Sequence, residues 1–387
     1  METQHGLFTL APDQTIYCSK GTFLVRVPAF PLTTFLHLTE QGCLLETSQE
    51  DKLDEVFSCL LQQGYDQVRA LMTDSEFLRV ALSLASQDLV RGFSRLQYDT
   101  ASPVRMKRVY SRLIRYVVRM STRATPFGLF AGVALGTIAD TTRLTLGERA
   151  FDHLHVRPDI GWLYAFLRDR EQQKHALAQM RLMVNSTAHV VGNRVLIASV
   201  DGFGNVGKET LSLRAAPLLR HILEIARQPI LYTDLVDSIS YSFPELLEPQ
   251  IHIVLQQLWN AHVFISMLHP PLTGGEPTAF VLKQMQTLPQ SPWGQRLQDE
   301  LTSLEQSLNS IQRVGISACD ALEEQFSKLF VLQDTLVPGY RHPLVQVDAA
   351  LMMEKPSLHT SVAVSVEEAA DVLLRLSTHG MRNEICN

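Results

Sequence analysis

The stretch RYVVRMSTRATPFGLFAG, Arg115–Gly132, decides how the first part of this chain folds, because it joins a helix to a turn and a strand. Upstream, Pro103 stands where a helix favours proline, in its first turn. Downstream, Pro126 disfavours helical backbone at the residue before it. The stretch therefore predicts a helix over about 103–121, a tight turn, and a strand over LFAGVALGTI, Leu129–Ile138.

The same stretch belongs to a basic stripe. No acidic residue lies between Asp99 and Asp140, and six arginines there are spaced by three or four: Arg105, Arg108, Arg112, Arg115, Arg119 and Arg123. On a helix, this spacing gathers them on one face. Like charges stacked in this way repel unless an anion or acidic surface offsets them, and guanidinium groups suit phosphate. A solvated face, pairing with acids elsewhere in the chain, and a phosphate-rich partner all remain open.

Composition limits the class of protein. The chain has 387 residues, of which 45% are apolar and 19% charged, as expected for a globular protein of two or three domains. The net charge is −6, so a site for a polyanion must be a local patch. The five cysteines are far apart and form no CxxC pair, which predicts no zinc site and no disulfide framework. We expect a reducing, cytoplasmic setting, with no secretory signal and no membrane-spanning segment.

Strands and helices alternate irregularly along the chain. TFLVRVPAFP, Thr22–Pro31, predicts a strand, and residues 50–97 repeat apolar residues at helical spacing. Residues 181–200 predict a hairpin that turns at Gly192-Asn193, and Lys208–Ala215 predicts another strand. Three helices are then expected, over residues 216–227, 231–243 and 247–266. Strands followed by such a unit are similar to a winged helix-turn-helix.

The last third begins after a loop. PPLTGGEP, Pro270–Pro277, indicates a boundary, Trp293–Val314 predicts an exposed amphipathic helix, and His342–Met353 predicts a strand. The expected fold class is α+β, with mixed sheets, packed helices and an embedded winged helix-turn-helix-like peptide-recognition unit. The expected division has three parts, 1–180, 181–270 and 271–387.

The arginine stretch also resembles a known family. RYVVRMSTRATPFGLFAG resembles the Arg-x-Ser-x-Arg-x-Thr-Pro-Phe-Gly-Leu-Phe signature of lantibiotic dehydratases. Four further pieces resemble that family in the same order: FLVRVPAFPL from Phe23, VRPDIGWL from Val156, FISMLHPPLTGGEP from Phe264, and LVQVDAAL from Leu344. The resemblance runs from about residue 22 to about residue 350.

This resemblance implies a function. Such enzymes take glutamate from glutamyl-tRNA, attach it to serine or threonine hydroxyls of a precursor peptide, and later eliminate it. The positions matched to glutamylation residues are Arg119, Arg123, Thr125 and Asp159. The expected tRNA-binding residues are Arg26, Arg108, Arg112 and Arg115, which would supply a positive track for phosphates. Glutamyl-tRNA would be a co-substrate, and no cofactor is expected.

The chain departs from the family in two ways. Met267 and His269 stand where the family pattern has Asp and Arg. Members of the family are also much longer, so we expect an N-terminal part of the glutamylation region, with a separately encoded remainder as a possible partner. Two alternatives stay open: a non-catalytic subunit that binds the leader of the precursor peptide, and an inactive truncated remnant.

The strand over Lys208–Ala215 is the expected peptide site. An edge strand offers unpaired backbone groups, so a leader peptide could add to it, with side-chain pockets between the strand and the helix around Ile251–Trp259. The expected peptide-binding residues are Thr210, Leu211, Ser212, Leu213, Leu255 and Trp259. The alternative is that another part of the chain already covers this strand.

Two other patterns are expected to be non-functional. GFGNVG, Gly202–Gly207, matches a phosphate-loop pattern, but a strand rather than a helix is expected to follow it, which favours a hairpin loop. His153, His155, His252 and His262 show no metal-ligand spacing, so no metal site is expected.

Overall fold

The computed structural model divides the chain into two compact units. Unit 1 comprises Met1–Leu154 and Asp348–Asn387, and unit 2 comprises His155–Val347. The structure describes residues 18–40, 52–98, 103–173, 175–200, 206–316, 318–341 and 344–385. The architecture is α+β, as predicted. The three-part division stays a prediction, and both of its internal boundaries fall within unit 2.

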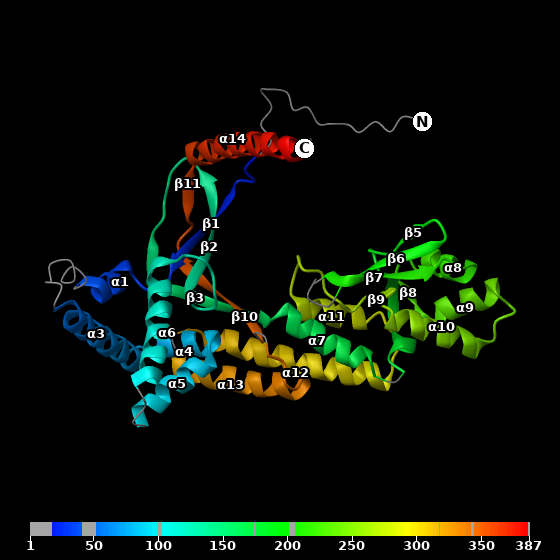
Figure 1. The fold of residues 1–387 in the computed structure, drawn as a ribbon, viewed down its shortest axis with the longest axis horizontal. Coiled ribbons are helices and arrows are strands. Elements are labelled where there is room, and N and C mark those ends of the chain that lie inside the picture. Colours follow the sequence, from blue (N-terminus) through cyan, green and yellow to red (C-terminus); the bar gives the residue numbers. More distant parts are fainter. Residues whose placement is uncertain are drawn as a thin grey trace. The chain divides into compact units, whose positions relative to one another are not determined.

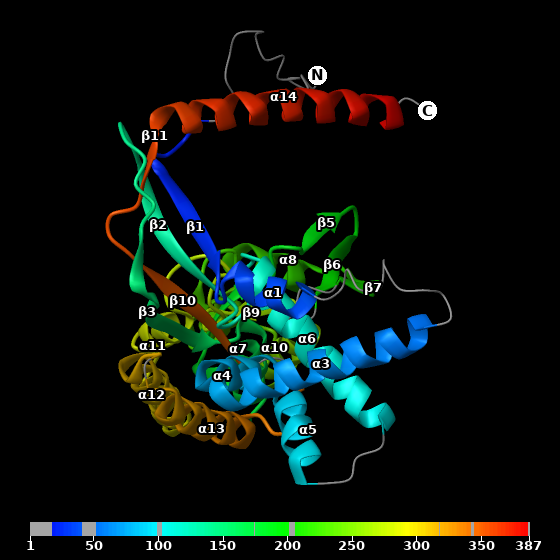
Figure 2. The same cartoon turned by 90° about the vertical axis from the view of Figure 1, so that its left-hand side faces the viewer.

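A mixed sheet lies mainly within unit 1, and two of its strands continue past the bounds of that unit. It has the order β1-β2-β10-β3, and β11 also pairs with β2. The strands are β1 (Thr22–Pro28), β2 (Ala131–Ala139), β3 (Leu146–Pro158), β10 (Val345–Met353) and β11 (Ser357–His359). β1 and β2 are antiparallel over their whole paired length, from Thr22 opposite Thr137 to Pro28 opposite Ala131 (Figure 2). β10 and β11 both run parallel to β2.

Helices make up most of the remaining described residues of unit 1. They are α1 (Leu32–Thr39), α3 (Leu53–Asp74), α4 (Glu76–Ala85), α5 (Gln87–Tyr98), α6 (Pro103–Thr122) and α14 (Thr360–Ile385). α6 begins at its proline, as predicted, and α3 packs across it (Figure 1). The rings of Tyr65 and Tyr110 stack between these two helices, with centroids 4.7 Å apart. Leu113, Val117 and Met120, the apolar face of α6, are completely buried.

The described residues of unit 2 include two small sheets. One has the order β8-β4-β9, and the other has the order β5-β6-β7. Their strands are β4 (Arg181–Val184), β5 (His189–Val191), β6 (Arg194–Val200), β7 (Val206–Arg214), β8 (Ile230–Leu231) and β9 (Phe264–Ser266). The predicted hairpin turn at Gly192-Asn193 is confirmed, and Gly192 has the positive φ, 57°, that such a turn requires. β4 was predicted to belong to this hairpin, but it lies in the other sheet.

Seven α-helices of unit 2 lie within its described residues. They are α7 (Ile160–Glu171), α8 (Pro217–Ile225), α9 (Tyr232–Ser242), α10 (Glu248–Asn260), α11 (Pro277–Met285), α12 (Pro292–Val314) and α13 (Cys319–Leu336). α12 and α13 lie side by side (Figure 1), and α12 buries a full apolar face that includes Leu301, Leu304 and Leu308. The winged helix-turn-helix interpretation of residues 181–270 stays a prediction.

The helix predicted over 247–266 is wrong at its end. α10 stops at Asn260, and Phe264–Ser266 forms β9 instead. His262 adopts the left-handed conformation with φ 57°. Its amide donates to the Trp259 carbonyl and the amide of Val263 donates to the Leu258 carbonyl, both at 3.0 Å. This is the Schellman arrangement, in which glycine usually takes the left-handed position. A histidine takes it here, so the sequence did not indicate that the helix ends.

Among the described helices, none is both long enough and apolar enough to cross a membrane. The GFGNVG pattern lies largely outside the described residues.

Candidate functional site

The arginine face of α6 is the first candidate site. We define this α6 arginine face as the six arginines at the predicted positions: Arg105, Arg108, Arg112, Arg115, Arg119 and Arg123. Arg119 is half-buried and the other five are exposed. Within the described part of the chain, no carboxylate lies within ion-pair distance of any of them. The positive charge of this face is therefore unneutralised by the described residues of the chain.

Four of these arginines share a cavity of about 530 Å³. Arg112, Arg115, Arg119 and Arg123 line it, together with Ser86, Leu89, Ile114, Tyr116 and Val118. No local signal in the sequence links Ser86 and Leu89 to the arginine helix, because they come from the junction of α4 and α5. Arg105 and Arg108 lie toward the other end of the helix and do not line the cavity.

The Pro-Phe-Gly turn holds Arg119 in place. Gly128 has a φ of 55°, which lets the chain reverse after Phe127. The guanidinium carbon of Arg119 then lies 4.6 Å from the centre of the Phe127 ring, a favourable cation–π distance. The Nε atom of Arg119 is buried and has no hydrogen-bond partner among the described residues. An arginine fixed against an aromatic ring with an unused donor is suited to bind an anion.

Three predicted residues lie elsewhere. Arg26 is exposed on β1, and Thr125 is exposed in the turn after α6; neither lines the arginine cavity. Asp159 belongs to unit 2, where it is the N-cap of α7. Its Oδ1 atom accepts hydrogen bonds from the amides of Gly161 at 2.9 Å and Trp162 at 3.3 Å. An aspartate directly before a helix is typical of an N-cap, so this structural role could also be predicted from the sequence.

The second candidate site is a pocket in unit 2, which we call the α7–α10 pocket. Its volume is about 1440 Å³, and Asp159 lines one part of it. One face of α7 contributes Tyr164, Arg168 and Glu171, which are spaced by four and three residues. α10 contributes Trp259, one of the predicted peptide-binding residues.

A histidine–glutamate pair lies in the wall of this pocket, with a buried carboxylate and a partly exposed imidazole. The Nε2–H group of His269 donates to Oε2 of Glu171 at 3.1 Å, and the Glu171 side chain is only 3% exposed. Burial disfavours the charged imidazole, but the negative charge of Glu171 and this hydrogen bond outweigh it, so the pKa of His269 is raised. Tyr164 stacks on His269 with ring centres 5.1 Å apart, and its hydroxyl donates to the Pro270 carbonyl at 2.5 Å. In the sequence His269 stood out as a departure from the family pattern, whereas Glu171 was not identified.

Three more histidines line the same pocket: His175, His252 and His262. His252 shares a 2.7 Å hydrogen bond with the Tyr232 hydroxyl and stacks on that ring. Burial, together with the positive charge of Arg168, lowers the pKa of His262. Across the described residues, no group of three or more His, Cys, Asp or Glu side chains is placed to hold a metal ion.

The other predicted peptide-binding residues divide between a strand and the core. β7 is an end strand of its sheet; Thr210 is exposed on it, and Leu211, Ser212 and Leu213 are half-buried. Leu255 is completely buried within unit 2. Trp259 and Leu255 therefore differ in role: both belong to α10, but only Trp259 lines the α7–α10 pocket.

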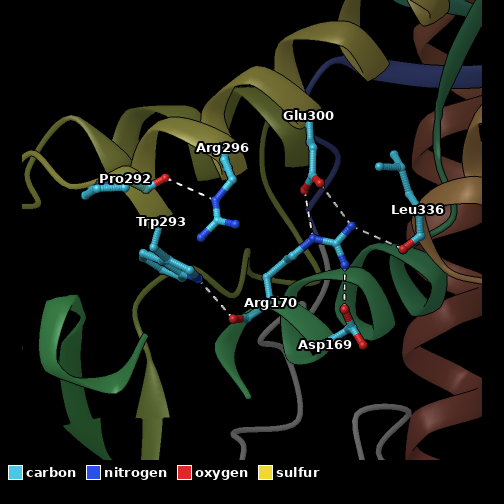
Figure 3. Close-up of polar contacts among 7 residues, drawn as sticks. All are labelled: Asp169, Arg170, Pro292, Trp293, Arg296, Glu300 and Leu336. Atoms are coloured by element: carbon cyan, nitrogen blue, oxygen red, sulfur yellow. Dashed lines mark hydrogen bonds and ion pairs between the residues drawn. The ribbon is translucent and has the colours of Figure 1, made fainter. Parts of the chain in front are cut away.

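α7 is fixed to the helices beside it by Arg170, as Figure 3 shows. Arg170 donates to both carboxylate oxygens of Glu300 on α12, at 2.7 and 3.2 Å, and to the Leu336 carbonyl of α13 at 3.3 Å. Its own carbonyl accepts a 3.0 Å hydrogen bond from the indole of Trp293. Arg170 directly precedes Glu171 in α7. The contacts of Arg170 therefore also fix the part of the pocket wall that Glu171 forms.

Comparison with known proteins places these features in a family. Residues 74–384 match the family model "Lantibiotic dehydratase, N terminus". The subtilin biosynthesis protein SpaB of Bacillus subtilis is 22% identical over 371 residues, covering 94% of this chain and 32% of SpaB. The crystal structure of the tRNA-dependent lantibiotic dehydratase MibB from Microbispora sp. 107891 is similar, with a TM-score of 0.68 and 25% identity over 92% of this chain and 31% of MibB.

A second solved structure has the same fold at lower identity. It is the glutamylation domain of TbtB from thiomuracin biosynthesis, with a TM-score of 0.58 and 14% identity over 87% of this chain and 50% of that one. The chain thus spans about a third of the length of the curated relative and of MibB.

Proposed function

Because this chain belongs to the lantibiotic dehydratase family, we propose that it serves in tRNA-dependent glutamyl transfer to serine and threonine residues of a precursor peptide. In this reaction the peptide hydroxyl oxygen attacks the glutamyl carbonyl of glutamyl-tRNA, and the ribose oxygen of the tRNA leaves with the proton. The description of MibB as tRNA-dependent and of the TbtB structure as a glutamylation domain supports this assignment.

The α6 arginine face carries the proposal. No described carboxylate lies within ion-pair distance of its four cavity-lining arginines. One guanidinium group can donate to two phosphate oxygens at once. The acceptor end of the tRNA supplies phosphates at regular spacing along a strand. Arg119, held against Phe127, would fix one phosphate or the esterified glutamate, and Arg123 at the end of the helix would contact the next group. Thr125 and Arg26 belong to the same proposal through the family pattern alone.

The relatives carry further sequence beyond the third that matches this chain. We propose that the complete reaction also needs that further sequence. Robust transfer of labelled glutamate by the 387 residues alone would show that it does not.

The test is tRNA binding by the double variant Arg119→Ala/Arg123→Ala. We expect weaker binding and a shallower salt dependence, by roughly 0.7–0.9 units of log–log slope for each lost phosphate contact. Arg143→Ala is the matched control, because this exposed arginine of unit 1 is already paired with Glu354 at 2.7 Å. Circular dichroism checks that the variants fold. If the double variant binds tRNA as the natural chain does, or if Arg143→Ala loses as much, the arginine face is not the tRNA site.

One observation favours a second function, binding of the precursor's leader. β7 is an end strand of its three-stranded sheet, so one of its backbone edges has no neighbouring strand in that sheet. A leader segment could add to this edge by backbone hydrogen bonds, with Leu211 and Leu213 giving specificity. This function does not require catalysis, and it can accompany glutamyl transfer.

A further inference from the structure

The α7–α10 pocket contains a buried carboxylate oxygen that has no donor. Glu171 is 3% exposed and uses Oε2 to accept from His269, while its Oε1 atom has no hydrogen-bond partner among the described residues. A buried acceptor left unpaired costs free energy, so native proteins usually supply a donor from the chain, from water or from a ligand. Because Glu171 lines the pocket, a bound molecule can supply that donor.

The position of Glu171 in α7 gives a second reason to look for a ligand. Glu171 is the last residue of the helix, where the partial negative charge of the helix end disfavours an anion. Its burial and its helix position are therefore both unfavourable for a carboxylate that serves packing alone. The site orients this carboxylate well, because the ring of His269 is itself held by stacking on Tyr164.

The surrounding charges favour a neutral donor over a cation. When it is protonated, His269 offsets the charge of Glu171, and its raised pKa widens the pH range over which it does so. Arg168 lies one turn earlier on the same face of α7. Its positive charge contributes to the lowered pKa of His262 and opposes the rise in the pKa of His269. An incoming ammonium group would be repelled by this positive field, whereas a hydroxyl group can donate to Oε1 without adding charge.

The walls and the size of the pocket suit an extended peptide. The side-chain amides of Gln172, Gln256 and Asn260 line it, and each can both donate to and accept from a peptide backbone. Trp259 adds an aromatic surface. The volume, about 1440 Å³, exceeds the roughly 300–1,000 Å³ of pockets that enclose small ligands.

We propose that the α7–α10 pocket receives an extended segment of the precursor peptide, and that Glu171 accepts a hydrogen bond from a serine or threonine hydroxyl of that segment. The inference rests on the proposed peptide substrate. It does not depend on the α6 arginine face, so experiments can refute the peptide pocket and the tRNA site independently of each other.

The test measures binding of labelled peptides to the complete chain. The probes are fluorescein-labelled dodecapeptide pools with randomised flanks and a fixed central Thr, Val or Lys, and the readout is fluorescence anisotropy. Valine has the shape of threonine without the hydroxyl. We expect the Thr pool to bind about tenfold or more tightly than the Val pool, as for a hydrogen bond to a charged acceptor.

Variants assign this preference to one side chain. Glu171→Gln removes the charge of the acceptor and Glu171→Met removes the acceptor itself, so we expect the preference for Thr over Val to shrink in the first and disappear in the second. Glu323→Gln, at an exposed carboxylate on α13, is the matched control and should keep the preference in full. Circular dichroism shows whether each variant is folded.

Three results would overturn the proposal. Equal binding of the Thr and Val pools by the natural chain excludes a hydroxyl contact. Tightest binding of the Lys pool makes the pocket a cation site, and no binding of any pool excludes a peptide segment. A Thr preference that depends on Glu171, found together with unchanged tRNA binding in the arginine double variant, would uphold the pocket and reject the tRNA site.

Discussion

Replacing Arg170 with methionine removes the main polar contact between α7 and the two long helices of unit 2. The side chain of Arg170 is 12% exposed. It donates twice to Glu300 and once to the Leu336 carbonyl, and it contacts Asp169 at 2.5 Å (Figure 3). Its guanidinium also lies 4.8 Å from the centre of the Phe166 ring. Methionine keeps much of the length of the side chain but makes none of these polar contacts.

The magnitude follows from what is left behind. Breaking a buried ion pair by removing one partner costs about 3–5 kcal/mol, because the other charge stays uncompensated. Glu300 is 31% exposed and can be partly hydrated, so the lower end of that range applies. Asp169 is 62% exposed, and an exposed pair adds at most about 1 kcal/mol. We therefore expect Arg170→Met to lower the free energy of unfolding of unit 2 by about 3 kcal/mol.

The assay is urea unfolding followed by tryptophan fluorescence. All three tryptophans, Trp162, Trp259 and Trp293, lie in unit 2, so the signal reports this unit without requiring both units to unfold together. The indole of Trp293 donates to the Arg170 carbonyl, which places one fluorophore beside the substitution. A loss of this size should lower the urea midpoint by about 1 M or more.

Arg296→Met provides the control in the same region. Arg296 is exposed on α12, and its Nε–H group donates to the Pro292 carbonyl of its own helix at 3.3 Å (Figure 3). We expect this change to stay within about 0.5 kcal/mol of the natural chain. If Arg170→Met costs no more than Arg296→Met, the Arg170 contacts do not anchor α7 and the reasoning is refuted.

Two further predictions concern pH and the leader peptide. In an NMR titration His269 should lose its proton at higher pH than His262, because Glu171 raises the first pKa against the effect of burial, whereas burial lowers the second. The stability from protonated His269 is then full below the pKa of an unfolded histidine and is lost as pH rises through the folded pKa; the reverse order of titration would contradict this. For the leader, Thr210→Pro or Ser212→Pro should abolish binding of a labelled leader peptide, since proline lacks the backbone donor. Folded variants that bind as tightly as the natural chain would show that the leader docks elsewhere.

Local patterns in the sequence determined the elements of the first candidate site. Proline at its start and arginines spaced by three and four predicted α6 and its basic face. The Pro-Phe-Gly turn and the Gly192-Asn193 hairpin were also predicted, because glycine permits the positive φ that the structure has at both places. The order of the motifs predicted the family. Each of these features depends on residues within a few positions of it, so a short stretch of sequence is enough to predict it.

Only the tertiary structure brought together the groups of the second site. Glu171 and His269 are 98 residues apart, and Arg170 and Glu300 are 130 apart. The strand β9 was mistaken for the end of α10, because a histidine rather than a glycine took the left-handed position after that helix. The sequence alone thus determined α6 and the two glycine turns, but not where α10 ends. It could not determine which side chains meet across the fold, because a buried ion pair leaves no periodic pattern in either of its two segments.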